Sequence, residues 1–182
     1  MKTFLIGGAR SGKSSLAARW AHERSKSVCC VVTATPSDTE MEARIAAHRR
    51  ERPPHWRVRE EPLRLGIAVA EESRTGELLL IDCLTLWTAN CLWPQANLPS
   101  EPQLVLQPDL QGWHSERDAF LESIRQASCD IIIVSNEVGT SLVPENAAAR
   151  VFRDEQGRLN QLVATACEAV FLVTAGLPLR LK

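Results

Sequence analysis

The feature that most constrains this chain is the stretch GGARSGKSS, which begins directly behind the apolar run Phe4-Leu5-Ile6. It fits the pattern G-x-x-x-x-G-K-[ST], with Gly7, Gly12, Lys13 and Ser14 at the fixed positions. An apolar strand pattern precedes the stretch and a helical composition follows it, and glycine lets the backbone between them turn tightly. The sequence therefore predicts a strand, a loop and a helix whose N-terminus and backbone N–H groups face a phosphate.

Two side chains give this loop its chemistry. Lys13 is predicted to reach the β- and γ-phosphates of a nucleotide, and the Ser14 hydroxyl to hold Mg²⁺. A plain glycine and serine turn is the alternative, and it leaves the lysine unexplained. The residues predicted to surround the phosphates are Gly7, Gly8, Ala9, Arg10, Ser11, Gly12, Lys13 and Ser14.

Further apolar runs alternate with helical patterns along the chain. Strands are expected at 2–6, 28–33, 77–82, 131–135 and 169–174, and helices at 14–23, 39–50, 62–72, 84–93, 112–127 and 144–168. Because the strand runs are continuously apolar, we expect burial on both faces of a sheet. The prediction is a P-loop NTPase-like, three-layer α/β/α fold with a mainly parallel central sheet, built as a single nucleotide-binding domain over 1–182. Residues 93–108 hold four prolines and read as a loop or insertion, and Gly157 is a candidate kink in the last helix.

Composition excludes several classes of protein. The net charge is −1, so no overall basic field favours nucleic acid or an anionic membrane. No apolar run approaches the ~20 residues of a membrane span, and no secretory leader pattern is seen at the N-terminus, so we expect a cytoplasmic protein. The six cysteines form no C-x-x-C pair, which argues against zinc and favours reduced thiols.

Carboxylates follow two of the predicted strands. Asp82 ends the run LLLID, where open α/β sheets place their ligands, and it resembles a Walker B aspartate that would complete the Mg²⁺ site with Ser14. Capping of the next helix is the alternative for Asp82. Glu137 follows IIIVSN and is a candidate to bind metal, orient water or accept a proton, with capping or loop structure equally open.

The segment TEMEARIAAHRRERPPHW places a histidine among arginines. On a helix, Glu40, Arg44 and His48 share one face. The surrounding positive charge would attract a polyphosphate and would favour neutral imidazole, which can act as a nucleophile. A solvated basic helix end, favoured by the helix dipole, is the alternative.

Together, the stretches GGARSGKS, EMEARIAAHRRERPPHWRVREEP, LLLIDCLTLW, VSNEVGTSLVPENAAARVFRDEQGRLNQLVA and FLVTAGLPLRLK resemble the bifunctional adenosylcobinamide kinase / adenosylcobinamide-phosphate guanylyltransferase family of cobalamin biosynthesis. The resemblance covers nearly the whole chain in order. Residues 93–108 do not align with it, and Ala47 stands where many relatives have a histidine.

The resemblance implies two reactions. ATP or GTP phosphorylates adenosylcobinamide, and GMP then passes from GTP to adenosylcobinamide phosphate through a GMP-histidine intermediate, which here falls on His48. It also implies a cytosolic homotrimer with sites near the subunit interfaces. For Trp87, Trp93 and Trp113 we expect core packing, and a role as interface aromatics is the alternative. The GTP contacts that it implies beyond the glycine-rich loop are Thr33, Ala34, Thr35, Arg49, Arg50, Glu51, Arg52, Glu60 and Asp82.

Two other functions are alternatives for a chain with this glycine-rich loop. A small-molecule kinase without nucleotidyl transfer would not need His48 in its arginine setting. A GTP-binding switch protein should carry a base-reading N-K-x-D sequence, and the chain has none. The sequence leaves the roles of Glu137, Arg153 and Asp154 open.

Overall fold

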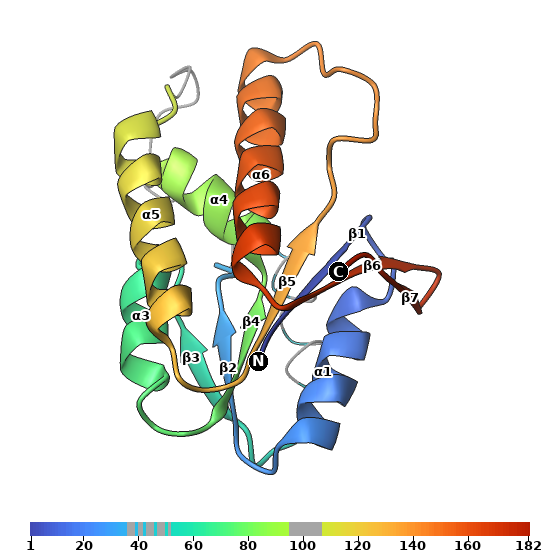
Figure 1. Cartoon of the computed structure of the whole chain (residues 1–182). Coiled ribbons are helices and arrows are strands. Elements are labelled where there is room, and N and C mark those ends of the chain that lie inside the picture. Colours follow the sequence, from blue (N-terminus) through green and yellow to red (C-terminus); the bar gives the residue numbers. More distant parts are fainter. Residues whose placement is uncertain (36–38, 40–41, 43–45, 47–49, 51, 95–106) are drawn as a thin grey trace.

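A computed structural model describes residues 1–35, 39, 42, 46, 50, 52–94 and 107–182. Strands and helices alternate along most of the chain, as the sequence predicts (Figure 1). In chain order the elements are β1 (Lys2–Gly7), α1 (Lys13–Arg24), β2 (Val28–Val32), β3 (Arg57–Glu60), α3 (Leu65–Glu72), β4 (Leu78–Asp82), α4 (Leu84–Leu92), α5 (Leu110–Gln126), β5 (Ile131–Asn136), α6 (Ala147–Ala166), β6 (Ala169–Thr174) and β7 (Leu177–Arg180).

The strands form one seven-stranded sheet in the order β3-β2-β4-β5-β1-β6-β7. Every neighbouring pair is parallel except β6 and β7, which are antiparallel. The expected α/β fold with a mainly parallel sheet is therefore confirmed. Because parallel strands all point the same way, their carboxyl ends meet along one edge.

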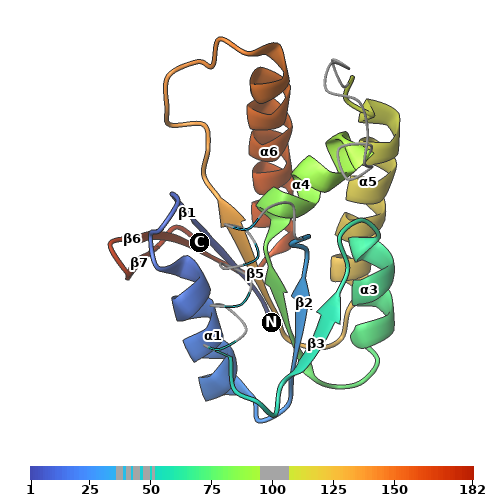
Figure 2. The same ribbon diagram turned by 180° about the vertical axis from the view of Figure 1, so that it is seen from behind.

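Helices cover both faces of this sheet (Figures 1 and 2). Among the described elements, α1 lies on one face, and α3, α4, α5 and α6 lie on the other. Successive strand residues divide between two cores, since Leu5 packs with α1 while Phe4 and Ile6 pack with the four-helix side. The central strands are buried on both faces, which is why they read as continuous apolar runs.

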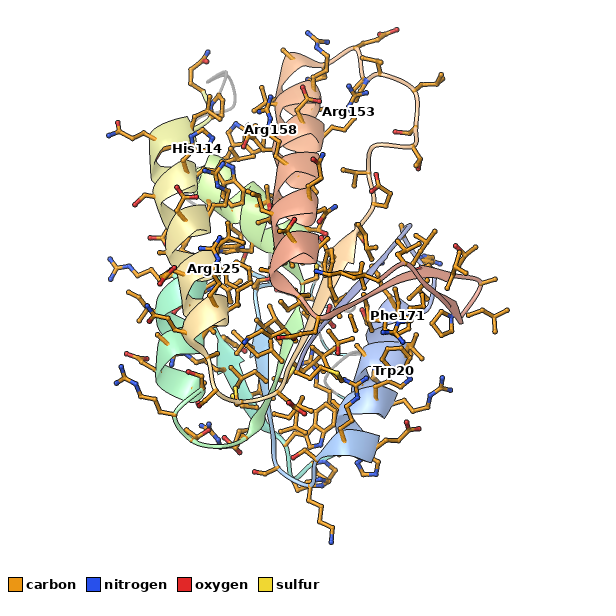
Figure 3. The ribbon with its side chains drawn as sticks, viewed as in Figure 1. Trp20, His114, Arg125, Arg153, Arg158 and Phe171 are labelled. Atoms are coloured by element: carbon orange, nitrogen blue, oxygen red, sulfur yellow. The ribbon has the colours of Figure 1, made fainter. Side chains whose placement is uncertain are left out.

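Aromatic side chains fill both layers. Trp87 and Trp113 are fully buried and pack edge to face at 5.1 Å between ring centroids, which supports their reading as core residues. On the other side of the sheet, Trp20 of α1 meets Phe171 of β6 at 4.9 Å (Figure 3). Trp93 is partly buried against the larger core.

The structure corrects several predicted boundaries. Two strands were missed: β3, whose sequence RVRE has no apolar run, and β7, whose sequence LPLR contains a proline. Gly157 does not divide α6, which is one helix of 20 residues. The helix predicted from residue 62 begins at Leu65. Of the helix predicted at 39–50, the four described residues are helical, and the rest of it lies outside the described residues, as do residues 95–106 of the proline-rich stretch.

Candidate nucleotide site

The loop after β1 adopts a conformation that needs its glycine. Gly12 has φ 89° and Arg10 has φ 57°, both in the left-handed region. The Gly176 N–H donates to the Ser11 carbonyl at 2.8 Å, which ties the loop to the turn between β6 and β7. A Cβ on Gly12 would lie only 3.1 Å from the Gly176 Cα, so this turn and the loop share a tight contact.

Lys13 and Ser14 begin α1 and turn back toward the loop and the sheet. The Lys13 ammonium donates to the Gly8 carbonyl at 3.0 Å, and its side chain is buried. Burial is the main influence that lowers the pKa of Lys13, and the nearby acidic groups of Cys83 and Asp82 act in the opposite direction. The Ser14 hydroxyl donates to Asp82 Oδ1 at 3.3 Å. The lysine, hydroxyl and carboxylate therefore converge at the start of α1.

The carboxyl ends of β3, β2 and β4 meet beside this loop. Val32 pairs in register with both Asp82 and Glu60, so the ends of three strands are level. Thr33 follows β2 and is fully buried, and its hydroxyl donates to the Cys83 carbonyl at 2.7 Å. The alternative that Asp82 caps the next helix does not match the structure, because Cys83 is the N-cap of α4 and no side chain caps that helix.

A cavity of about 300 Å³ adjoins the loop on the α1 side of the sheet. Its lining includes the Ser14 hydroxyl, the Asp82 carboxylate and the side chains of Arg19, His22 and Arg52. A pocket lined by a hydroxyl, a carboxylate and two arginines can take a metal-bound phosphate group.

Comparison with known sequences shows the family to which this chain belongs. Residues 3–181 match the family described as cobinamide kinase / cobinamide phosphate guanyltransferase. The chain belongs to this family. It is a bifunctional enzyme of adenosylcobalamin biosynthesis, with cobinamide kinase and cobinamide phosphate guanylyltransferase activities.

Curated relatives match this chain over its whole length. The bifunctional adenosylcobalamin biosynthesis protein CobP of Pseudomonas aeruginosa is 44% identical over 100% of this chain and 98% of its own length. The bifunctional adenosylcobalamin biosynthesis protein CobU of Escherichia coli is 34% identical, with 100% of both chains covered.

Solved structures show the fold at much lower identity. An ATPase of a bacterial type III secretion system has a TM-score of 0.57 and 11% identity over 95% of this chain, which spans about half (52%) of that longer chain. The RadB recombinase has a TM-score of 0.51 and 14% identity over 94% of this chain and 73% of its own. The fold of this cobinamide kinase is thus that of the P-loop ATPases.

Several other residues that the family resemblance predicts to contact GTP lie at or near the carboxyl edge of the sheet. Ala34 and Thr35 are half-buried after β2, Glu60 is exposed at the end of β3, and Arg52 lines the cavity. Arg50 is exposed, and its guanidinium donates to the Ala46 carbonyl at 3.3 Å. The remaining three predicted site residues lie outside the described residues: His48, Arg49 and Glu51.

Glu137, Arg153 and Asp154, whose roles the sequence leaves open, make local contacts. The Glu137 carboxylate accepts from the Gly139 N–H at 2.5 Å, which shapes the loop after β5. Arg153 pairs with its neighbour Asp154 at 3.4 Å on the exposed side of α6. These local contacts assign no catalytic role to the three residues.

Sequence reasoning missed the polar side chains that hold the strand ends in place. Asn90 on α4 donates to the Thr33 carbonyl at 2.8 Å and to the Pro62 carbonyl at 3.2 Å, joining the segments after β2 and β3. Thr85, also on α4, accepts from the Asn136 N–H at 2.8 Å. The signal available in the sequence was a set of isolated polar residues within the otherwise apolar run LTLWTANCL.

Away from this site, Cys29, Glu72 and Glu77 come close enough to suggest a metal. The Arg57 guanidinium, however, donates to both carboxylates, and Arg59 also donates to Glu72, so arginines already pair with both acidic groups. Burial is the main cause that raises the pKa of the Cys29 thiol to about 11, so the thiol stays protonated. This cluster is an ion-pair network that fastens β3 to α3 and β4.

Proposed function

We propose that one triphosphate site at the carboxyl edge serves both reactions. The glycine-rich loop holds the β- and γ-phosphates of ATP or GTP, while adenosylcobinamide or its phosphate approaches from solvent. The observation that carries this proposal is the convergence of Lys13 Nζ, at 3.0 Å from the Gly8 carbonyl, with the Ser14–Asp82 pair. A buried ammonium inside a loop of backbone N–H groups is a site for a polyphosphate.

Ser14 and Asp82 fit a magnesium ion. Their oxygens approach within 3.3 Å, and Mg²⁺ prefers hydroxyl, carboxylate and phosphate oxygens as ligands. We assign these two residues as the protein's contribution to the metal shell. When bound, Mg²⁺ neutralises negative charge on the phosphates.

For guanylyl transfer, we propose that His48 is the nucleophile. Its imidazole nitrogen bonds to the α-phosphorus of GTP, and the bond from that phosphorus to the bridging oxygen breaks, releasing pyrophosphate. An oxygen of cobinamide phosphate then bonds to the same phosphorus, and the phosphorus–nitrogen bond breaks to restore the histidine. Covalent catalysis divides one displacement into two easier ones, and Arg49, Arg50, Glu51 and Arg52 would surround the nucleotide during both.

The test uses GTP labelled at the α-phosphorus, followed by denaturation of the protein. We expect label on the intact protein and none on His48→Ala. The matched control is His55→Ala, which removes an exposed histidine and should keep the label. Lys13→Ala should lose both kinase and transferase activity, because each needs the triphosphate to be held. Label on His48→Ala, or normal rates for Lys13→Ala, would refute the respective assignment.

We also propose a cytoplasmic homotrimer built from one domain per chain. Leu177 and Leu179 of the edge strand β7, with Leu181 just beyond it, are more than half exposed, which favours a protein interface there. All six cysteines are free thiols, in keeping with a reducing compartment. None of the described helices combines the length and apolar character needed to cross a membrane. Light scattering after size-exclusion chromatography measures the mass of the assembly.

A further inference from the structure

Two helices hold both backbone polar groups of a single residue, Asn136, at the carboxyl end of β5. Its N–H donates to Thr85 Oγ1 on α4 at 2.8 Å. Its carbonyl accepts from Asn160 Nδ2 on α6 at 3.0 Å. Both side chains are at least nine-tenths buried, at 8% and 5% exposure. We call Thr85 and Asn160 the Asn136 clamp.

A cluster of buried polar groups fixes the Asn160 side of this clamp. Asn160 Oδ1 accepts from the Ser135 hydroxyl at 2.8 Å and from Gln156 Nε2 at 3.0 Å. Gln156 Nε2 also donates to Ser135 Oγ at 2.9 Å, and both residues are fully buried. Because the oxygen of the Asn160 amide is already engaged by two donors, its nitrogen is left to face the Asn136 carbonyl. Buried polar clusters of this kind specify one geometry where apolar packing would tolerate several.

The clamp connects directly to the phosphate loop. Asn136 pairs in register with Gly7, and the next N–H, that of Glu137, donates to the Gly7 carbonyl at 2.9 Å. Lys13 Nζ lies 3.0 Å from the Gly8 carbonyl, and a lysine at this position contacts the β- and γ-phosphates. The first residues of the loop, Gly7 and Gly8, therefore lie at the end of the loop that faces the γ-phosphate. The clamp sets the position of the end of β5, to which Gly7 is hydrogen-bonded.

We infer that Thr85 and Asn160 are positioning residues for the kinase step, acting through the backbone of Asn136 on the γ-phosphate end of the loop. In that step the cobinamide hydroxyl oxygen bonds to the γ-phosphorus, the bond to the β,γ-bridging oxygen breaks, and the hydroxyl proton is released to solvent. In the guanylyl step the nucleophile attacks the α-phosphorus, two phosphates away from the γ-phosphorus. That step therefore depends less on the part of the loop that faces the γ-phosphate. The inference rests on the proposed placement of the triphosphate.

The test compares Thr85→Val with Thr85→Ser. Valine has nearly the shape of threonine but accepts no hydrogen bond, whereas serine keeps the hydroxyl. We expect Thr85→Val to lower kcat of the kinase step by about 10- to 100-fold, the loss typical of a small misplacement. We expect KM for the nucleotide to stay within about twofold, because ground-state binding is largely kept. Thr85→Ser should restore most of the rate.

Asn160→Leu tests the other half of the clamp, and Gln161→Leu is its matched control. Gln161 is an exposed amide at the adjacent position of α6, and no described contact joins its side chain to β5. The control should be as active as the native chain, and Asn160→Leu should lose kinase activity with retained labelling from α-labelled GTP. Thermal melting of every variant separates a general loss of folded protein from a selective loss of rate.

Equal kinase rates for Thr85→Val and Thr85→Ser would overturn the inference. The inference would also be wrong if a clamp variant lost kinase activity and α-label incorporation to the same extent. It would be wrong too if the kinase rate of each variant, divided by its folded fraction, equalled that of the native chain. Failure of the proposed function looks different: the native chain itself would then retain no α-label, while the comparison of kinase rates among the clamp variants would still stand.

Discussion

Gly7→Ala is the sharpest test of how the phosphate loop is packed. A Cβ on Gly7 would lie 2.3 Å from the Val173 carbonyl oxygen and 2.8 Å from Ser11 Oγ. The first of these neighbours is backbone of β6, so it has no flexible side chain that could swing away. To reach an ordinary contact, β1 and β6 must separate locally by about 1 Å, a shift of the kind that overpacked cores show.

The size of the effect follows from this overlap. Overpacking of this kind lowers the free energy of unfolding by about 1–3 kcal/mol. For a chain of this length that is a fall in Tm of about 3 to 9 °C. Because Gly7 begins the loop, a shift of about 1 Å should also lower kcat/KM for the kinase step by roughly 100-fold.

The assay is thermal unfolding followed by circular dichroism, together with kinase rates at a temperature where all variants are folded. Gly8→Ala is the matched control for stability, since a Cβ there meets nothing within 4 Å and Gly8 has no left-handed φ. Its Tm should equal that of the native chain. If Gly7→Ala melts within about 1 °C of the native chain and keeps its kinase rate, the close approach does not constrain the loop and the reasoning is wrong.

Two further predictions concern contacts that stabilise the fold. Glu155 is 3% exposed and accepts from Trp113 Nε1 at 2.8 Å between α5 and α6, so Glu155→Leu should leave a buried N–H unpaired and lower the free energy of unfolding by about 1–3 kcal/mol. Denaturant titration measures this, and a change no larger than that of Glu155→Gln would contradict it. The hydrogen bond from Arg57 is the main cause that holds the pKa of Glu77 below its usual value, so the stability that this pair contributes is present above about pH 4.5 and is lost as pH falls through the lower folded-state pKa. The stability gap between the native chain and Arg57→Met should therefore be full at pH 7 and shrink below pH 4.5, and a gap that stays constant to pH 3 would refute the ion-pair explanation.

The contacts of Glu155 with Trp113, His114 and Arg158 also show why contacts between helices are hard to predict from a sequence. Figure 3 places His114 on α5 and Arg158 on α6, and Glu155 bonds to both of them as well as to the buried indole of Trp113. Arg158 follows Glu155 by three residues on α6, but Trp113 and His114 come from α5, and no spacing in the sequence relates one helix to the other. A charged residue on an amphipathic helix is ordinarily expected to face solvent.

What the sequence determined by itself was local. The loop from Gly7 to Ser14 forms between one strand and the next helix, so its glycines and its lysine could be read from consecutive residues. The buried strands were readable because a strand covered on both faces must be apolar at successive positions. The ordered series of motifs also identified the family, which the comparisons confirm, while the role of His48 stays a prediction.

The tertiary structure decided everything that depends on which segments become neighbours. Strand β3 has no apolar run to signal it in the sequence. Its backbone pairs with β2, and Arg57 and Arg59 bond to carboxylates on α3 and before β4. Asp82 can bond to Ser14 because the sheet places β4 near β1, with only β5 between them. Asn136 gained its two hydrogen bonds from helices that lie before and after it in the chain. Hydrogen bonds act over about 3 Å, so they report on spatial proximity, which a linear pattern of residue types does not encode.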